Sequence, residues 1–338
     1  MLILGIESTC DETAIAIVEN GRKIHSNVLR SQIETHKRYG GVFPELASRQ
    51  HVDHLLPLIE RALKEAGYTK RDIDLIAVSY APGLIGCIVM GLNCAKALSY
   101  ALDIPFIGVH HVEAHLYSAI MSRDEKATYP ALGLVLSGGH TLMARIDDIG
   151  SYTLLGSTVD DAIGECFDKV ARFLDLPYPG GPEIEKLALS GNATKYPFKA
   201  GRVKGKPLHF SFSGLKTNVL YSIKGQNNNK KAPSILSEDE KADVAASFQE
   251  AAFKDIIKKT ILAARMENIQ DIYLGGGVTN SSALRAMFEK ADSKLNFHFP
   301  KKELCQDNAA MIAGLGYHKY LSGNASSLDL EAIPRVQL

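Results

Sequence analysis

The start of the chain and its middle share one order of apolar segments and polar turns, and this repeat constrains the fold most. Residues 2–7 and 13–18 are apolar segments joined by a polar loop, and the turn Asn20-Gly21 leads into a third segment, 23–29. Because Asn-Gly accepts the positive φ angles of a tight hairpin, this order predicts a three-stranded meander. The same order returns over residues 132–155. Such a duplication, with helices after each copy, predicts two related lobes.

Strands and helices alternate after the first meander. Apolar residues recur at helical spacing over 44–66, and Gly67 follows as a C-cap residue would. Residues 73–78 and 105–109 are typical of buried strands, and an apolar helix is predicted between them at 87–102. This alternation predicts α/β layers with parallel pairing.

The length of 338 residues exceeds the ~250–300 at which a single hydrophobic core stops growing. We therefore expect two lobes with a cleft between them, 1–125 and 126–300, and a C-terminal helix at 307–325 that packs back on the first. The apolar fraction of 46% excludes disorder, and 38 basic against 38 acidic residues argue against a protein that coats nucleic acid.

No apolar run approaches the ~18 residues of a membrane-spanning helix, and no export signal is present at the N-terminus. The five cysteines include no CxxC pair, so neither a disulfide framework nor a thiolate zinc site is indicated. We expect a cytoplasmic protein without a membrane partner.

His111 and His115 are candidate metal ligands. Four residues apart on a helix, both imidazoles project from one face with Cβ atoms ~5–6 Å apart. Asp307, where another helix is predicted to start, is the candidate third ligand. Two ordinary histidines and an N-cap aspartate remain the alternatives. A zinc metalloprotease would need glutamate directly after the first histidine, where Val112 stands, so that chemistry lacks its base.

Three glycine loops, at residues 137–139, 180–181 and 275–277, follow apolar segments or a proline. A P-loop and a strand-led G-x-G-x-x-G are both absent, which disfavours P-loop and dinucleotide-binding domains. Glycine loops spread around an interlobe cleft are typical of the nucleotide site of actin and sugar kinases.

Residues 191–236 contain nine Lys or Arg and no Asp or Glu, and we expect a basic, loop-rich insertion here. It can bind RNA phosphates, although a solvated loop explains the composition equally well. Ser237 and Glu240 have the capping-box pattern that begins a helix.

Seven motifs in unbroken order resemble the tRNA N6-adenosine threonylcarbamoyltransferase (TsaD) family, formerly described as glycoproteases. They are the sequence 5–13, the sequence 40–49, the pair His111 and His115, and the sequences 136–141, 178–182, 210–217 and 307–311. The resemblance implies an α/β fold of the two-lobed actin-like ATPase type (ASKHA, a duplicated ribonuclease H-like unit).

The family resemblance also implies an activity. A threonylcarbamoyl group would pass from threonylcarbamoyl-AMP to the N6 amine of the adenosine just 3′ of the anticodon, in tRNAs that read codons starting with adenosine, and AMP would be released. A small-molecule phosphotransferase of the same fold and a non-catalytic, nucleotide-dependent scaffold are the alternatives.

Site residues follow from the resemblance, residue by residue. His111, His115 and Asp307 would hold iron, with zinc as the alternative, and Asp11 and Glu12 would lie near the reacting groups. The adenylate would contact Val135, Leu136, Ser137, Gly138, Gly139, Asp168, Gly181, Glu185 and either Asn280 or Ser281. The choice between Asn280 and Ser281 is open. The family usually has asparagine at the position of Ser281, and in this chain the asparagine, Asn280, lies one residue before it.

The expected partners are the anticodon loop of tRNA, a TsaB-like paralogue and a TsaE-like P-loop ATPase, with a homodimer as the state of the isolated chain. ATP with Mg²⁺ is a further expected ligand.

Overall fold

The computed structural model describes residues 1–225, 236–323, 325–336 and 338. These residues form two compact units, each containing one five-stranded sheet. Unit 1 comprises Met1–Ala127, Asp148–Tyr152 and Phe299–Leu338, and unit 2 comprises Thr128–Asp147 and Thr153–His298.

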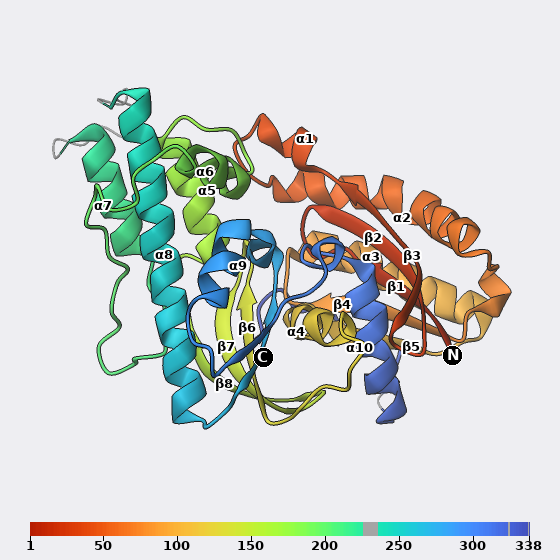
Figure 1. Ribbon diagram of the computed structural model, residues 1–338. Coiled ribbons are helices and arrows are strands. Elements are labelled where there is room, and N and C mark those ends of the chain that lie inside the picture. The colour runs from red at the N-terminus through yellow and green to blue at the C-terminus, as the bar shows by residue number, and fades with distance from the viewer. Residues whose placement is uncertain (226–235, 324, 337) are drawn as a thin grey trace. The chain divides into compact units, whose positions relative to one another are not determined.

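Unit 1 opens with the predicted meander and continues with alternating strands and helices (Figure 1). Its strand order is β3-β2-β1-β4-β5, with β1 antiparallel to β2 and parallel to β4. Its elements are β1 (Leu2–Glu7), β2 (Glu12–Glu19), β3 (Lys23–Ser31), α1 (Ile33–Lys37), α2 (Pro44–Ala66), η1 (Lys70–Asp72), β4 (Leu75–Ala81), α3 (Ile85–Leu102), β5 (Phe106–His110), α4 (His111–Met121), η3 (Lys302–Leu304) and α10 (Ala309–Leu321).

Strand β1 is buried on both faces, as its uninterrupted apolar sequence predicts. Leu4 and Ile6 join the core cluster that includes α2 and α3. Gly5 points to the other side, where an added Cβ would lie 2.3 Å from the carbonyl oxygen of Ala309 in α10. The close approach of α10 to β1 therefore depends on the absence of a side chain at Gly5.

Helix α3 corrects one sequence prediction. It has 18 residues and is apolar enough, by length and composition, to cross a membrane. In the fold it packs against β4 and α2 and buries Cys87, Ile88, Gly91, Leu92 and Ala95. Core helices of α/β domains commonly have a length and an apolar composition that overlap with those of membrane-spanning helices.

Unit 2 repeats the sheet topology of unit 1. Strand β6 is antiparallel to β7 and parallel to β9, as β1 is to β2 and β4, and the strand order is β10-β9-β6-β7-β8. The predicted duplication is therefore confirmed. The elements are β6 (Ala131–Leu136), β7 (Thr141–Asp148), β8 (Ser151–Ser157), α5 (Ile163–Phe173), α6 (Gly180–Ala188), α7 (Ser213–Lys224), α8 (Glu238–Met266), β9 (Asp271–Gly275), η2 (Gly277–Asn280), α9 (Ser282–Glu289) and β10 (Asn296–His298).

The basic segment 191–236 is less loop-rich than expected, because α7 occupies twelve of its residues. The carboxylate of Asp160 accepts hydrogen bonds from the backbone N–H groups of Phe212 and Ser213 at the start of this helix. Lys230 and Lys231 lie outside the described residues. The capping box of Ser237 and Glu240 begins α8 as predicted.

Candidate active site

Helix α4 presents the two candidate histidine ligands. It begins directly after β5, so His111 is its first residue and His115 lies one turn further on. The two imidazole centroids are 4.6 Å apart, and both side chains are buried. The predicted pairing of the two rings on one helix face is present in the structure.

Asp307 reaches the same place from the start of α10. The N-cap of α10 is Asn308, whose side-chain oxygen accepts a hydrogen bond from the backbone N–H of Met311 at 3.0 Å. The N-cap interpretation of Asp307 is therefore wrong. Its Oδ1 lies 3.1 Å from Nε2 of His115 and 3.5 Å from Nε2 of His111. Figure 1 shows α4 side by side with α10, whose N-cap, Asn308, directly follows Asp307.

The cluster fits a metal ion. One ligand atom from each of His111, His115 and Asp307 lies within 4.8 Å of the others. Within the part of the chain that the structure describes, neither ring nitrogen of the fully buried His115 has a partner in hydrogen-bonding geometry, although Oδ1 of Asp307 lies 3.1 Å from Nε2. Buried polar atoms without partners are rare because desolvation is costly. A cation bound to Nε2 would satisfy one of them, and two imidazoles with one carboxylate suit zinc or iron.

The two imidazoles have different electrostatic surroundings in the metal-free protein. Burial disfavours the charged form of His111, but Glu7 and Asp307 outweigh it and raise the pKa of His111 to about 9. Burial lowers the pKa of His115, against the opposing effect of Asp307. Two causes separate them: Oε2 of Glu7 lies 2.9 Å from Nδ1 of His111 and stabilises its charged form, and the charge of His111 lowers the pKa of His115.

Asp11 and Glu12 stand at the junction of a polar loop and β2. His51, on α2, holds this junction: its Nε2 lies 2.9 Å from the carbonyl oxygen of Cys10, and its Nδ1 2.7 Å from the hydroxyl of Thr13. Burial first, and then the charges of Asp11 and Asp307, raise the pKa of Glu12 well above its usual value. The charge of Asp307 therefore acts on Glu12, which connects one predicted catalytic acid with the candidate metal ligands of unit 1.

Unit 2 holds the predicted adenylate contacts, which begin at the end of β6. After Val135 and Leu136, the N–H of Ser137 donates to the carbonyl oxygen of His140 at 2.8 Å. This closes the loop over Gly138 and Gly139, around whose Cβ positions nothing lies within 4 Å. The loop therefore leaves open space beside its backbone.

Asp168 and Glu185 are half-buried acids, and each accepts a backbone hydrogen bond. The carboxylate of Asp168 accepts a hydrogen bond from the N–H of Gly180, the first residue of α6, at 2.7 Å. Oε1 of Glu185 accepts from the N–H of Ala283 at the start of α9 at 2.9 Å. Each acid therefore fixes a helix start, and Asp168 fixes the one that carries Gly181.

Ser281 and Asn280 differ in availability. The hydroxyl oxygen of Ser281 caps α9 by accepting from the N–H of Leu284 at 3.2 Å. Asn280, the last residue of η2, is exposed.

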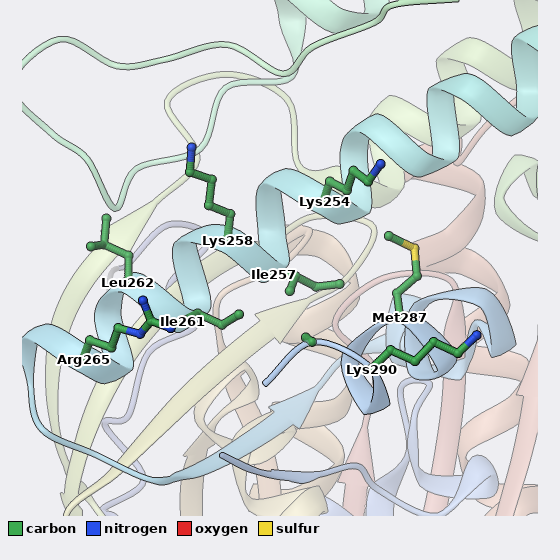
Figure 2. A pocket seen from close by; sticks show the side chains of 9 residues that line it. Lys254, Ile257, Lys258, Ile261, Leu262, Arg265, Met287 and Lys290 are labelled. Carbon is green, nitrogen blue, oxygen red and sulfur yellow. The ribbon is translucent and has the colours of Figure 1, made fainter. Parts of the chain in front are cut away.

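A groove elsewhere in unit 2 contains none of the predicted site residues. It lies between α8 and α9 and has a volume of about 570 Å³ (Figure 2). Its lining combines apolar side chains, including Ile257, Ile261, Leu262 and Met287, with the basic Lys254, Lys258, Arg265 and Lys290.

Comparison with known proteins decides the family. The model of the family "tRNA N6-adenosine threonylcarbamoyltransferase" (TsaD) matches residues 23–314. The enzyme of that name from Protochlamydia amoebophila is 58% identical over 339 residues, which cover 100% of this chain and 98% of the relative. This chain belongs to the TsaD family. The family member from Clostridium kluyveri is 47% identical, with 99% of this chain and 97% of the relative covered. The expected family is thus confirmed.

Solved structures support the actin-like ATPase fold. Full-length HypF in a phosphate- and nucleotide-bound form matches with a TM-score of 0.64 at 15% identity; the match covers 96% of this chain but 47% of HypF, so this chain spans about half of that protein. The activator of 2-hydroxyisocaproyl-CoA dehydratase from Clostridium difficile matches with a TM-score of 0.53 at 12% identity over 96% of this chain and 97% of the activator.

Sequence reasoning missed three buried polar residues around the TsaD-family metal cluster. Glu7 contacts His111, His51 holds the loop before Glu12, and Glu113 forms an ion pair with Lys319 at 2.7 Å. Each of these residues contacts a partner that is distant in sequence, so no local pattern indicates the contact. The one signal in the sequence was the carboxylate of Glu7 at the end of an apolar segment.

Proposed function

We propose that this TsaD-family enzyme transfers a threonylcarbamoyl group from threonylcarbamoyl-AMP to the N6 amine of the adenosine just 3′ of the anticodon, in tRNAs that read codons starting with adenosine, and releases AMP. Its family membership supports tRNA threonylcarbamoylation over a phosphotransferase or a scaffold. The cluster of His111, His115 and Asp307 carries the mechanistic part of the proposal. Kinases of this fold hold Mg²⁺ through carboxylates and phosphates, so two imidazoles distinguish this site from theirs.

His111, His115 and Asp307 would hold one divalent metal, iron in our proposal and zinc as the alternative. Such an ion supplies Lewis-acid stabilisation of negative charge on an oxygen. Both imidazoles are buried, so water is excluded from their side of the site. In such surroundings, the ion would stabilise negative charge on the substrate oxygen more strongly than it would in water.

Asp11 or Glu12 would accept the proton of the attacking amine. The N6 nitrogen forms a bond to the carbonyl carbon, the bond from that carbon to the phosphate oxygen breaks, and AMP leaves with the electron pair. Because the mixed anhydride is already activated, the enzyme mainly has to position the amine and stabilise the developing oxyanion. The raised pKa of Glu12 makes its carboxylate, once ionised, a stronger base than an ordinary glutamate.

The loop residues of unit 2 would bind the adenylate. The open space beside Gly138, Gly139 and Gly181 permits close backbone approach to a phosphate or ribose. Asp168 and Glu185 would contact ribose hydroxyls in addition to fixing their helix starts. Of the two adenine-side candidates we favour Asn280, because the oxygen of Ser281 already caps α9.

Binding of tRNA would use the described lysines and arginines of residues 195–224. Lys216 is an exception, since it forms an ion pair with Asp161. A TsaB-like paralogue and a TsaE-like ATPase would be the protein partners, a homodimer would be the state of the isolated chain, and the cytoplasm would be the compartment. ATP with Mg²⁺ would be a further ligand.

Reconstitution with threonylcarbamoyl-AMP and unmodified tRNA tests the proposal. We expect AMP release with label entering the tRNA, and loss of both after treatment with a chelator. Release of ADP with a phosphorylated small molecule would support the phosphotransferase instead.

Single-turnover transfer by Asp11→Ala and Glu12→Ala tests the proton acceptor, with the exposed Glu34→Ala as the matched control. A rate unchanged in both site variants at saturating substrates would exclude this role.

A further inference from the structure

We propose that Glu7 is a positioning residue of the metal site: its carboxylate fixes the ring of His111 with Nε2 directed at the ion, and so sets how tightly the site binds a divalent metal. This inference rests on the proposed function, because it requires His111, His115 and Asp307 to be the ligands.

Glu7 is the last residue of β1, and its side chain is fully buried. Both carboxylate oxygens are used. Oε1 accepts a hydrogen bond from the N–H of Thr9 at 2.6 Å, and Oε2 lies 2.9 Å from Nδ1 of His111. The backbone turn after β1 therefore holds the carboxylate in place while the carboxylate holds the imidazole.

This contact selects one tautomer of His111. A carboxylate oxygen accepts hydrogen bonds, so Nδ1 keeps its proton, and the proton on Nε2 is the one that a binding metal displaces. Nε2 is the nitrogen that faces Asp307, at 3.5 Å. A carboxylate on the far side of an imidazole also increases the basicity of the ligating nitrogen.

His115 provides an internal contrast. Its Nδ1 is buried and has no hydrogen-bond partner among the residues that the structure describes, and its carboxylate contact, with Asp307, is on Nε2. Only His111 thus has a carboxylate on the nitrogen opposite the one that faces the candidate metal site. A buried carboxylate is costly unless it is paired or well hydrogen-bonded, and His111 with the N–H of Thr9 supplies that compensation for Glu7.

The test is Zn²⁺ affinity, measured by competition with a chromophoric chelator, for the wild type and for Glu7→Gln. Glutamine keeps the volume but removes the charge and one acceptor oxygen. We expect the Zn²⁺ dissociation constant to rise by ~10–100-fold, the usual effect of removing an outer-sphere partner of a ligating histidine.

Glu113→Gln is the matched control. Glu113 is also a buried carboxylate close to His111 in sequence, but its partner is Lys319. This variant should lose folding stability while its Zn²⁺ affinity stays within ~2–3-fold of the wild type, because Glu113 shares no partner with the cluster. Equal weakening in both variants, or no weakening in Glu7→Gln, would overturn the inference.

A measurement on the wild type covers the case in which Glu7→Gln does not fold. In the zinc-loaded protein labelled with ¹⁵N-histidine, NMR should show a proton on Nδ1 of His111, shifted downfield by the carboxylate, and zinc on Nε2. A proton on Nε2 would refute the inference. If the wild type bound no Zn²⁺, or if His115→Ala bound it equally well, the metal centre of the proposed function would be wrong instead.

Discussion

The cluster of candidate metal ligands in unit 1 and the glycine loops of unit 2 are built on opposite principles. His111, His115 and Asp307 are grouped side chains, of which the two histidines are buried and Asp307 is partly exposed. The loop at Gly138 and Gly139 offers backbone atoms and open space. One region depends on which side chains are present, and the other on which are missing.

This contrast predicts different responses to substitution. A change in the cluster should remove a chemical group and leave the surrounding packing in place. A change in the loops should add atoms, and its effect should depend on whether the added atoms meet protein or open space.

The largest effect is expected for His115→Ala. Metal affinity should fall by more than the ~10–100-fold typical of an outer-sphere change, and threonylcarbamoylation should fall with it. The stability of the metal-free variant should fall much less than its metal affinity: the lost ring leaves a cavity, but its buried Nδ1 has no hydrogen-bond partner among the described residues, so its removal relieves a desolvation cost. Metal analysis after dialysis and urea unfolding measure the two quantities. The control is His25→Ala, which removes a half-buried histidine paired with Glu19. Equal metal loss in this variant would show that the effect is not specific to the candidate ligand His115.

Gly276→Ala comes next and should act on folding. Gly276 has a φ of 93°, and an added Cβ would lie 2.4 Å from the carbonyl oxygen of Leu136. A backbone conformation of this kind costs a non-glycine residue about 1–3 kcal/mol. Urea unfolding should show this loss, whereas Gly277→Ala, one residue later with nothing within 4 Å, should leave stability nearly unchanged. An equal loss of stability in both variants would show that open space around the added Cβ does not determine the effect.

Gly138→Ala should separate binding from folding. Its Cβ would enter open space, so the free energy of unfolding should change by less than ~0.5 kcal/mol. The same methyl group should hinder the adenylate and weaken binding of a non-hydrolysable analogue about tenfold, or ~1.4 kcal/mol. Calorimetric titration measures the affinity. Unchanged affinity would place the adenylate away from this loop.

Sequence reasoning predicted local features well. The two meanders, the Asn20-Gly21 hairpin, α2 with its Gly67 cap and the capping box of α8 are all present, because each depends on neighbouring residues. The strand predicted at 73–78 lies instead at Leu75–Ala81, since an apolar run marks a strand better than its ends. Helix α7 was missed because Asp160, which binds its first N–H groups, is distant in sequence.

The candidate site divides in the same way. The spacing of His111 and His115 predicted their shared face, because a helix fixes it. The sequence alone left Asp307 with an equally good role as an N-cap, and only the fold shows that Asn308 has that role. The contact of Glu7 with His111 joins the end of one strand to a helix that follows another, and no local pattern records it.

The smallest effect we expect is a pH-dependent gain in stability from Glu12→Gln. Burial and the charges of Asp11 and Asp307 raise the pKa of Glu12 in the folded protein, so folding favours the protonated form. The wild type therefore loses stability relative to the variant as pH rises above the usual glutamate value of ~4.3, and the difference is complete above the folded-state pKa. Thermal unfolding of both metal-free proteins from pH 4 to pH 8 should show two curves that diverge with rising pH. Bound metal should reduce the difference in stability between the two proteins, because a cation beside Asp307 offsets the repulsion between Asp307 and the ionised Glu12. Parallel curves would mean that folding does not raise the pKa of Glu12. The charge of Asp307, a candidate metal ligand, would then have no effect on the proposed proton acceptor.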